Sequence, residues 1–528
     1  MLLSILLLLL PSTLALRAEG DARPNMIVYL PDTIRADSLS VYGHPLTSTP
    51  NAARLAASGV TFSQAHAQHT QCTPSRCALL SGRYMHVLGH RTQNHLLQPQ
   101  EQNVFALLKA SGYTTVSLGK NDAISTGAMN ASFTFWQEDI GVSMGGNPFA
   151  FGEAGYYAMA AGPGPLPANS TGNGDVLQAR LVADLLLGGS LPEPFAIIMT
   201  GVGGHPPYGA PEPYHSMYSG AQVKAASPLR AFAPGLPPHL SPQGIVHYRN
   251  LTSFPESFFY DLAAIYLGRV SYMDMQLGMV LDALEASTHA NTTAMFFTSD
   301  HGDYHGEYSA IEKFPCGLED ALTRVPLLAS MPGGARGAVI ASPVETLDLF
   351  ATLLDLAGLL SPSISGPGAL ERHFSVSLLP ALQSGSASSG QWKPYIFSEA
   401  GYAQGTAEME PLDPAQASIY ANPRNTYYAR GVEEQVPQHC TRAVMMRNAS
   451  AKLVFRPAPG TSELYDLSSD AAEQHNLYGT PSAAALQAQM QLDMLAWMTQ
   501  TSDVTPRLED PRDDPPMPPT PAWWPTKP

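Results

Sequence analysis

The stretch C-T-P-S-R-C-A-L-L-S-G-R, residues 72–83, places a cysteine, a rigid proline and an arginine directly before an apolar helical pattern. Pro74 fixes its own φ and suits the first turn of a helix. Cys72 would then lie at the helix N-terminus, where unpaired N–H groups and the helix dipole favour negative charge. Arg76 adds a planar, permanently charged group that matches tetrahedral oxyanions. The stretch therefore predicts a nucleophile turn at an anion site. The alternative is that Cys72 is a small buried hydrophobe and Arg76 a surface charge.

Four short apolar stretches along the chain have the length and composition of buried strands. They are rich in Val, Ile, Phe and Met, and helical patterns such as residues 49–58 and 262–284 separate them. This alternation predicts an α/β fold, with a large domain whose mainly parallel central sheet is flanked by helices. In the second helical pattern, apolar residues recur every three or four positions, which indicates a core face. The four stretches are residues 25–31, 114–119, 194–201 and 291–298.

Chemically active residues follow each of these predicted strands. Asp32, Lys120, His205 and Asp300 stand at or just beyond the four carboxyl ends. Ligands in open α/β sheets bind beyond those ends, so the four side chains are expected to converge. Two carboxylates, a lysine and a histidine brought together form a metal and anion site.

The stretch at residues 72–83 resembles the sulfatase signature C-x-P-S-R-x-x-x-L-x-G-R, and every fixed position of that signature matches. In this family the cysteine is converted to Cα-formylglycine, in the endoplasmic reticulum or by bacterial counterparts. The resemblance implies an alkaline-phosphatase-like fold and, during maturation, a formylglycine-generating enzyme as a partner. A cysteine-phosphatase loop would need an arginine six residues after Cys72, where this chain has Ala78.

The resemblance also implies a divalent metal, Ca²⁺ with Mg²⁺ as the alternative, because hard cations prefer oxygen ligands. The segments L-P-D-T-I-R-A-D and T-S-D-H-G-D are similar to the family's metal segments. Thr33 stands where many members have a second acidic ligand. Asp37 is an alternative ligand, although a carboxylate that faces solvent or caps a helix is its more ordinary role. The expected ligands are Asp32, Thr33, Cys72, Asp300 and His301.

The catalytic residues that the resemblance implies are Cys72, Arg76, Lys120, His205 and Lys313. Lys120 lies in G-K-N-D, similar to the family's G-K-x-H segment, with Asp122 in place of the histidine. Lys120 and Lys313 would hold sulfate oxygens, and Arg76 would support the hydrated aldehyde. Either His205 or Lys313 would donate the proton to the leaving group.

Sequence composition divides the chain into four parts. Residues 1–20 resemble a signal peptide, whose leucine-rich run is too short to span a membrane. Residues 24–380 are the expected catalytic domain, and residues 381–503 a smaller C-terminal α+β domain with a short antiparallel sheet and a final helix. Residues 504–528 form a Pro-rich tail.

The signal-like segment and several N-x-S/T sequons predict a glycoprotein of the secretory pathway, secreted or lysosomal, without a transmembrane anchor. Once Cys72 is converted, the remaining cysteines Cys77, Cys316 and Cys440 allow one disulfide at most. The sequons begin at Asn130, Asn169, Asn250, Asn291 and Asn448.

The formal net charge of −16 excludes a nucleic-acid-binding surface, which needs clustered Lys and Arg. The predicted function is hydrolysis of sulfate monoesters on a small molecule or glycan. The first alternative is a phosphodiesterase or phosphonate monoester hydrolase of the same superfamily. The second is a non-catalytic glycoprotein that binds sulfated ligands.

Overall fold

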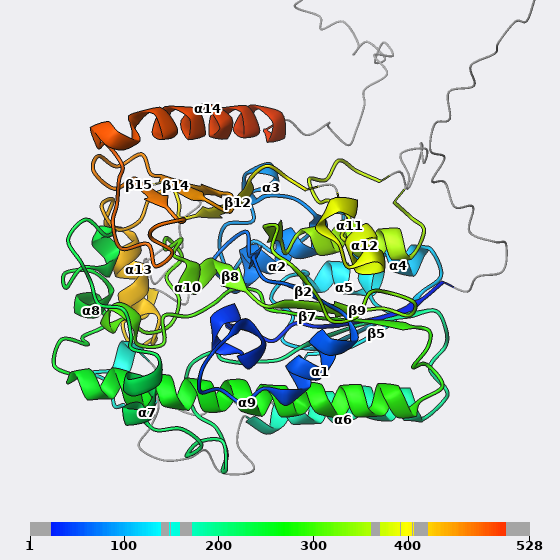
Figure 1. Cartoon of the computed structure of the whole chain (residues 1–528). Coiled ribbons are helices and arrows are strands. Elements are labelled where there is room, and N and C mark those ends of the chain that lie inside the picture. Colours follow the sequence, from blue (N-terminus) through cyan, green and yellow to red (C-terminus); the bar gives the residue numbers. More distant parts are fainter. Residues whose placement is uncertain are drawn as a thin grey trace, which may run out of the picture.

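The computed structural model describes residues 23–138, 147, 149–158, 172–360, 370–390, 392–403, 405 and 421–502. Its centre is an eight-stranded sheet in the order β10-β2-β9-β7-β1-β6-β4-β5 (Figure 1). All neighbouring strands are parallel except for β9, which runs antiparallel to β2 and β7. The predicted, mainly parallel sheet is therefore confirmed. The strands are β1 (Asn25–Tyr29), β2 (Val60–Phe62), β4 (Thr114–Gly119), β5 (Phe135–Gln137), β6 (Phe195–Thr200), β7 (Thr293–Thr298), β9 (Leu327–Ser330) and β10 (Ala338–Ile340).

Alternation along the strands supplies two hydrophobic cores, one on each face of the sheet. In β1, Ile27 and Tyr29 enter one core while Met26 and Val28 enter the other. Helices α1 (Pro50–Ser58), α6 (Gly172–Leu187), α7 (Gly220–Ala226) and α9 (Glu256–Ala286) cover the first face. The second face is covered by α2 (Cys72–Ser81), α4 (Val104–Ala110), α5 (Thr126–Ser132), α11 (Asp348–Leu356) and α12 (Leu379–Ser384).

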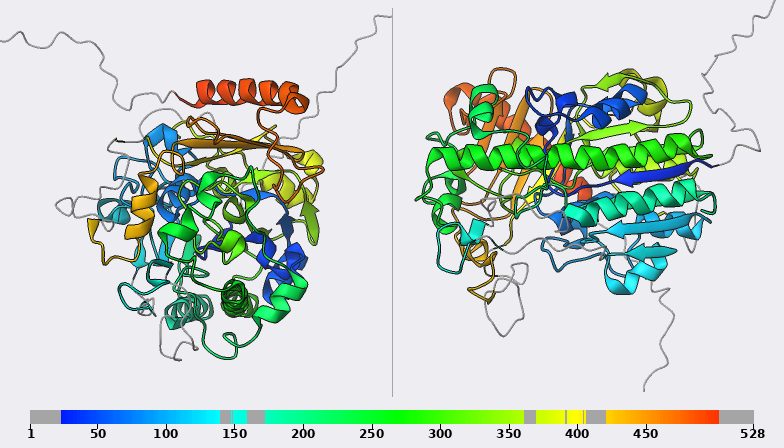
Figure 2. Two further views of the ribbon diagram at one scale, coloured as in Figure 1. Left: turned by 90° about the vertical axis from the view of Figure 1, so that its left-hand side faces the viewer. Right: turned by 90° about the horizontal axis from the view of Figure 1, so that it is seen from below.

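The long helix α9 confirms the predicted core helix and extends it at both ends. Seen from below, it runs beside α6 across the sheet (Figure 2). Its predicted apolar positions are buried, among them Tyr266, Val270 and Leu277. The helical pattern at residues 49–58 likewise corresponds to α1.

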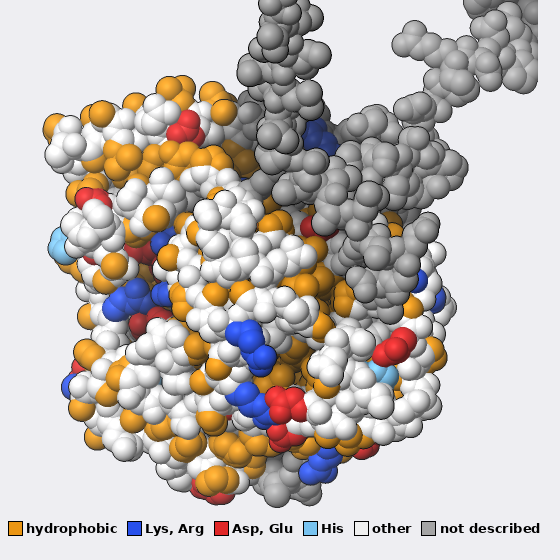
Figure 3. Space-filling model, turned by 45° about the vertical axis from the view of Figure 1, so that its right-hand side comes forward, with side chains coloured by type: hydrophobic (Ala, Val, Ile, Leu, Met, Phe, Trp, Pro, Cys, Tyr) orange, Lys and Arg blue, Asp and Glu red, His pale blue; other side chains and the backbone are white. Residues whose placement is uncertain are grey.

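The C-terminal part contains the predicted antiparallel sheet, in the order β12-β13-β14-β15, with α14 (Ala484–Thr501) above it (Figure 1). Helix α13 (Tyr428–Glu434) lies near one end of this sheet. In the space-filling view, hydrophobic side chains line the top of the molecule over α14 (Figure 3), where Leu492 and Leu495 are exposed. The strands are β12 (Ile396–Ala400), β13 (Ala443–Arg447), β14 (Ala451–Phe455) and β15 (Glu463–Asp466).

Short elements make up the connections. A small three-stranded sheet consists of β3 (Ala65–His66), β8 (Arg324–Val325) and β11 (Val344–Glu345). Short α-helices are α3 (Met85–Leu88), α8 (Ile245–Tyr248) and α10 (Asp320–Thr323). The 3₁₀ turns are η1 (Ala36–Ser38), η2 (Ser40–Tyr42), η3 (Tyr156–Ala158), η4 (Pro238–Leu240), η5 (Glu307–Ser309), η6 (Ala387–Ser389) and η9 (Pro481–Ala483).

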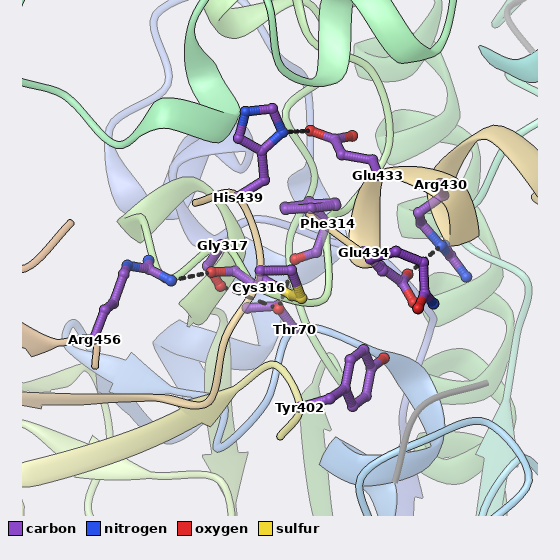
Figure 4. Close-up of a disulfide and its surroundings, with 12 residues drawn as sticks. Thr70, Phe314, Cys316, Gly317, Tyr402, Arg430, Glu433, Glu434, His439 and Arg456 are labelled. Carbon is purple, nitrogen blue, oxygen red and sulfur yellow. Dashed lines mark hydrogen bonds and ion pairs between the residues drawn. A yellow bond between two sulfur atoms is a disulfide. The ribbon is translucent and has the colours of Figure 1, made fainter. Parts of the chain in front are cut away.

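The disulfide Cys316–Cys440 joins the two parts covalently, across a sequence separation of 124 residues (Figure 4). Cys72 and Cys77 are free thiols. This pairing agrees with the expectation of one disulfide at most.

Several predictions are not tested by this structure. Residues 1–20, residues 504–528 and Asn169 lie outside the described residues, and the domain boundaries stay a prediction. Glycosylation also stays a prediction; Asn130, Asn250 and Asn291 are exposed, and Asn448 is half-buried. Within the described residues, no helix combines the length and apolar character that a membrane span requires.

Candidate active site

Helix α2 presents Cys72 at its first residue, as the sequence predicts. Pro74 follows in the first turn, and the helix ends at Gly82, whose φ of 67° only glycine adopts easily. Before the helix, Tyr402 of the C-terminal part donates a hydrogen bond to the side chain of Gln71 at 2.9 Å. Both parts of the chain therefore hold the segment that places Cys72.

Three buried side chains surround Cys72, and two of them, Asp32 and Asp300, belong to the four that the strand ends were expected to bring together. The ligating atoms of Asp32, Cys72, Asp300 and His301 all lie within 4.8 Å of one another. The Cys72 Sγ lies 3.3 Å from the His301 Nε2 and 3.7 Å from the Asp32 Oδ1. Four of the five residues predicted as metal ligands therefore lie in one buried cluster.

The donors of this cluster fit a divalent cation. The Nδ1 of His301 lies 2.9 Å from the carbonyl oxygen of Gly302, which can only accept a hydrogen bond. Nδ1 therefore carries the ring proton, and the Nε2 lone pair points at the carboxylates. With two carboxylates beside it, the set suits a hard cation such as Ca²⁺ or Mg²⁺.

Thr33 contacts the carboxylates that form the cluster. Its hydroxyl donates to the Asp32 Oδ1, and its backbone N–H donates to the Asp300 Oδ1 at 3.0 Å. Its φ is 63°, a conformation that costs a branched residue energy and persists where the surroundings impose it. Thr33 thus orients both aspartates, while its role as a ligand stays a prediction.

Arg76 bridges the same two carboxylates, and this contradicts a solvent-exposed surface charge. Its Nε donates to the Asp300 Oδ2 at 2.8 Å, and its Nη2 donates to the Asp32 Oδ2 at 3.2 Å. The side chain is only 1% exposed. Removing one partner of such a buried pair would leave an uncompensated charge.

Lys120 reaches the site from the end of β4. Its Nζ pairs with Asp32 and lies 3.4 Å from the Cys72 Sγ. Asp122 pairs with the same Nζ at 3.0 Å, so it neutralises Lys120 from the solvent side. Burial alone would raise the pKa of Asp32, but the charges of Lys120 and Arg76 lower it well below its usual range.

Burial and the Asp32 carboxylate raise the pKa of Cys72 to about 12, against the opposing effect of the nearby lysines. The thiol is therefore neutral at physiological pH and, as a thiol, a weak nucleophile. The N-terminus of helix α2 favours negative charge at residue 72, whereas the carboxylates of Asp32 and Asp300 raise the pKa of its thiol.

His205 is carried by a loop that packs directly on the metal segment. A Cβ at Gly203 would lie 2.4 Å from the carbonyl oxygen of Asp32, and one at Gly204 would lie 2.5 Å from that of Thr33. Only glycines allow this approach, which fixes the His205 that follows. His205 is 4% exposed, and its Nδ1 lies 2.6 Å from the carbonyl oxygen of Pro206.

Lys313 is 1% exposed, on the loop that follows η5. Its Nζ lies 3.2 Å from the Glu312 Oε1 and makes no well-aligned hydrogen bond within the described residues. Burial lowers the pKa of Lys313, but the carboxylates of Glu312 and Asp32 raise it, so the side chain stays charged. Lys313 is a buried cation with donors left for an anion.

Sequence reasoning missed three residues around Lys313 and His205. Glu312 pairs with Lys313, Arg430 pairs with Glu312 at 3.0 Å, and the Tyr427 hydroxyl lies 3.4 Å from the His205 Nε2. Glu312 could have been suspected as an ion-pair partner because it precedes Lys313. Tyr427 and Arg430 lie far along the chain in a segment without a recognisable motif.

Two carboxylates and a histidine lie buried beside residue 72, with two lysines around them, an arrangement that could hold a divalent cation and an anionic group together. The chain belongs to the sulfatase family, because the family model named Sulfatase matches residues 24–359, more than half of the chain. As a member, it is an enzyme of the class that acts on sulfate esters.

Similar proteins include both sulfatases and hydrolases of related esters. Human iduronate 2-sulfatase is 27% identical over 400 residues, covering 64% of this chain and 70% of its own. The multifunctional alkaline phosphatase superfamily protein PehA of Trinickia caryophylli is 25% identical over 534 residues, covering 92% and 96%. The solved phosphonate monoester hydrolase of Agrobacterium radiobacter shares the fold, with a TM-score of 0.67, 19% identity and coverage of 91% and 96%.

Proposed function

We propose that this protein hydrolyses sulfate monoesters to an alcohol and inorganic sulfate, with formylglycine at position 72 as the nucleophile. The observation that carries the proposal is the convergence on Cys72 of Asp32, Asp300 and His301, with Lys120 close to its sulfur. The substrate would be a sulfated small molecule or glycan. Processing in the secretory pathway, by a formylglycine-generating enzyme, belongs to the same proposal.

A hydrated aldehyde at position 72 carries two hydroxyls, and each has a step to perform. One hydroxyl, which releases its proton to water, attacks sulfur in line while the S–O bond to the alcohol breaks. The second hydroxyl then releases its proton to water, the carbonyl re-forms, and the C–O bond to sulfate breaks. Water restores the hydrate. Serine or cysteine lacks the second hydroxyl and would remain sulfated.

The residues around position 72 hold the anion and the metal. Lys120 and Lys313 would clamp the sulfate oxygens, where their charges offset the charge of the transition state. Asp32, Asp300, His301 and residue 72 would hold Ca²⁺, or Mg²⁺ in its place. When bound, the cation supplies Lewis-acid stabilisation at the attacking hydroxyl.

The leaving group requires a proton, and we assign its donor to Lys313. A carbonyl oxygen only accepts, so the contact of the His205 Nδ1 with Pro206 places the ring proton on Nδ1. Burial and the nearby Lys313 and Lys120 lower the pKa of His205 well below its usual range, so Nε2 carries no proton. Lys313 keeps its protons and faces the same site.

The experiment is expression with a formylglycine-generating enzyme, followed by mass analysis of the peptide bearing residue 72 and parallel assays on aryl sulfates and phosphodiesters. We expect the formylglycine mass and faster sulfate hydrolysis, with Cys72→Ser folded but without turnover. A preference for phosphodiesters above about tenfold, equal to about 1.4 kcal/mol, would favour the phosphodiesterase or phosphonate monoester hydrolase alternative. An unmodified thiol in protein from its native route would favour a non-catalytic glycoprotein.

A further inference from the structure

A tyrosine from the C-terminal part lies against the catalytic histidine. Tyr427 directly precedes α13, and its hydroxyl oxygen is 3.4 Å from the Nε2 of His205. Because the ring proton of His205 is on Nδ1, the Tyr427 hydroxyl is the donor of this contact. The contact connects residues 222 positions apart in sequence.

Buried charges hold Tyr427 in place and connect it with Lys313. The guanidinium of Arg430 lies 4.6 Å from the centroid of the Tyr427 ring, a cation–π distance. The same guanidinium pairs with Glu312 at 3.0 Å, and Glu312 pairs with Lys313 at 3.2 Å. A continuous set of contacts therefore runs from Lys313 through Glu312, Arg430 and Tyr427 to His205.

Glu312, the carboxylate among these residues, pairs with Lys313, Arg430 and Arg249. Burial alone would raise the pKa of Glu312, but Lys313, Arg430 and Arg249 lower it to about 2. Glu312 and Arg430 are 2% and 3% exposed. Arg430 pairs with Glu312 through Nη1 and with Glu434 through Nε, so two buried ion pairs hold the guanidinium against the Tyr427 ring.

We propose that Tyr427 is a positioning residue of the hydrolytic site, holding the His205 ring in place by donating its hydroxyl to Nε2 and linking it to the cation Lys313 through Arg430 and Glu312. This inference rests on the proposed function. It assigns the C-terminal part a role in catalysis, because Tyr427 and Arg430 contact His205 and the Lys313 partner Glu312.

The test compares Tyr427→Phe with wild type and with Tyr428→Phe, a control one residue further along the chain. Phenylalanine keeps the ring under Arg430 and removes only the hydroxyl. With an aryl sulfate we expect Tyr427→Phe to lower kcat about tenfold and to change KM by less than about twofold. Tyr428→Phe should retain the wild-type values, and thermal melting should show that all three proteins are folded.

A second measurement does not depend on turnover. Long-range ¹H–¹⁵N spectra of histidine-labelled protein, assigned with His205→Gln, report which ring nitrogen carries the proton. We expect the Nδ1–H form in both proteins, because the Pro206 carbonyl remains, and a shifted Nε2 resonance in Tyr427→Phe, because that nitrogen loses its hydrogen bond. An unchanged His205 signal overturns the proposal, whether or not kcat falls. If wild type hydrolyses no sulfate ester, the proposed function fails, and the spectra still decide the role of Tyr427.

Discussion

His205 and Lys313 flank the same buried site, yet their hydrogen-bond partners give them different abilities. The His205 ring commits its proton to a carbonyl oxygen 2.6 Å away, and Lys313 pairs with Glu312 through one side of its ammonium group. The two residues therefore differ in whether they can protonate a departing alcohol. The hydrogen bond of His205 and the ion pair of Lys313 therefore determine which of them carries a proton toward the site.

We predict that Lys313→Ala and His205→Ala respond differently to the acidity of the leaving group. A good leaving group needs little protonation, so Lys313→Ala should lose about 10²-fold to 10⁴-fold more in kcat with a poor leaving group than with an activated aryl sulfate, where only its contact with the sulfate oxygens is missed. For His205→Ala, the factor by which kcat falls should be the same with a poor leaving group as with an activated aryl sulfate. Steady-state kinetics on a series of aryl sulfates checks this. A steeper leaving-group dependence in His205→Ala would reverse the assignment.

The positions of site residues could be predicted where a sequence motif contains them. They could not be predicted where the backbone is strained. The signature placed Cys72 and Arg76, and strand ends placed Asp32 and Asp300. The left-handed conformations of Thr33, Asp122 and Glu312, with φ of 63°, 45° and 67°, carry no signal in the sequence. Tertiary contacts impose them, and each lies within two residues of a site residue.

Among the elements, β1, β4, β6 and β7 were the most predictable because each is a short apolar run buried on both faces. Helix α13 was not predicted. It has seven residues, and its charged side chains face buried partners rather than solvent. A hydrophobic pattern cannot reveal an element that is held by ion pairs, and for that reason Tyr427 and Arg430 were missed.

The disulfide stabilises this element, because it ties the loop after Lys313 to the residue Cys440 beyond α13 (Figure 4). We predict that the double variant Cys316→Ser, Cys440→Ser loses about 2–4 kcal/mol of unfolding free energy, since the unfolded chain regains the freedom of a long loop. Urea denaturation followed by circular dichroism measures this. Cys77→Ala is the matched control for removing a buried sulfur. An unchanged urea midpoint in the double variant would contradict the prediction.

Across the whole molecule, buried carboxylates join the C-terminal part to the large sheet. Glu399 of β12 pairs with Arg91 and with His86, Glu312 pairs with Arg430, and the backbone N–H of Glu399 donates to the Gln68 carbonyl at 2.8 Å. Burial alone would raise the pKa of Glu399, but Arg91 and His86 lower it to about 2. The ion pairs between the C-terminal part and the large sheet therefore depend on ionised carboxylates.

We predict that acid destabilises the protein through these groups. A carboxylate whose pKa falls from 4.5 to about 2 on folding stabilises the fold above pH 4.5. That stabilisation, on the order of 3 kcal/mol for Glu399, is lost as the pH falls toward 2. Urea midpoints measured from pH 7 to pH 2 should fall most steeply below 4.5. Glu399→Gln should lower stability at pH 7 and flatten the slope, whereas the exposed Glu256→Gln should do neither.

The burial of Cys72 sets an order of events in the life of the protein. Its side chain is 1% exposed, and Tyr402 of the C-terminal part is bonded to the neighbouring Gln71, so a modifying enzyme has no access to it after folding. If residue 72 is to become an aldehyde, conversion must come first and folding second. Protein that folds with an intact thiol is then a dead end: only unfolding, conversion and refolding would recover it.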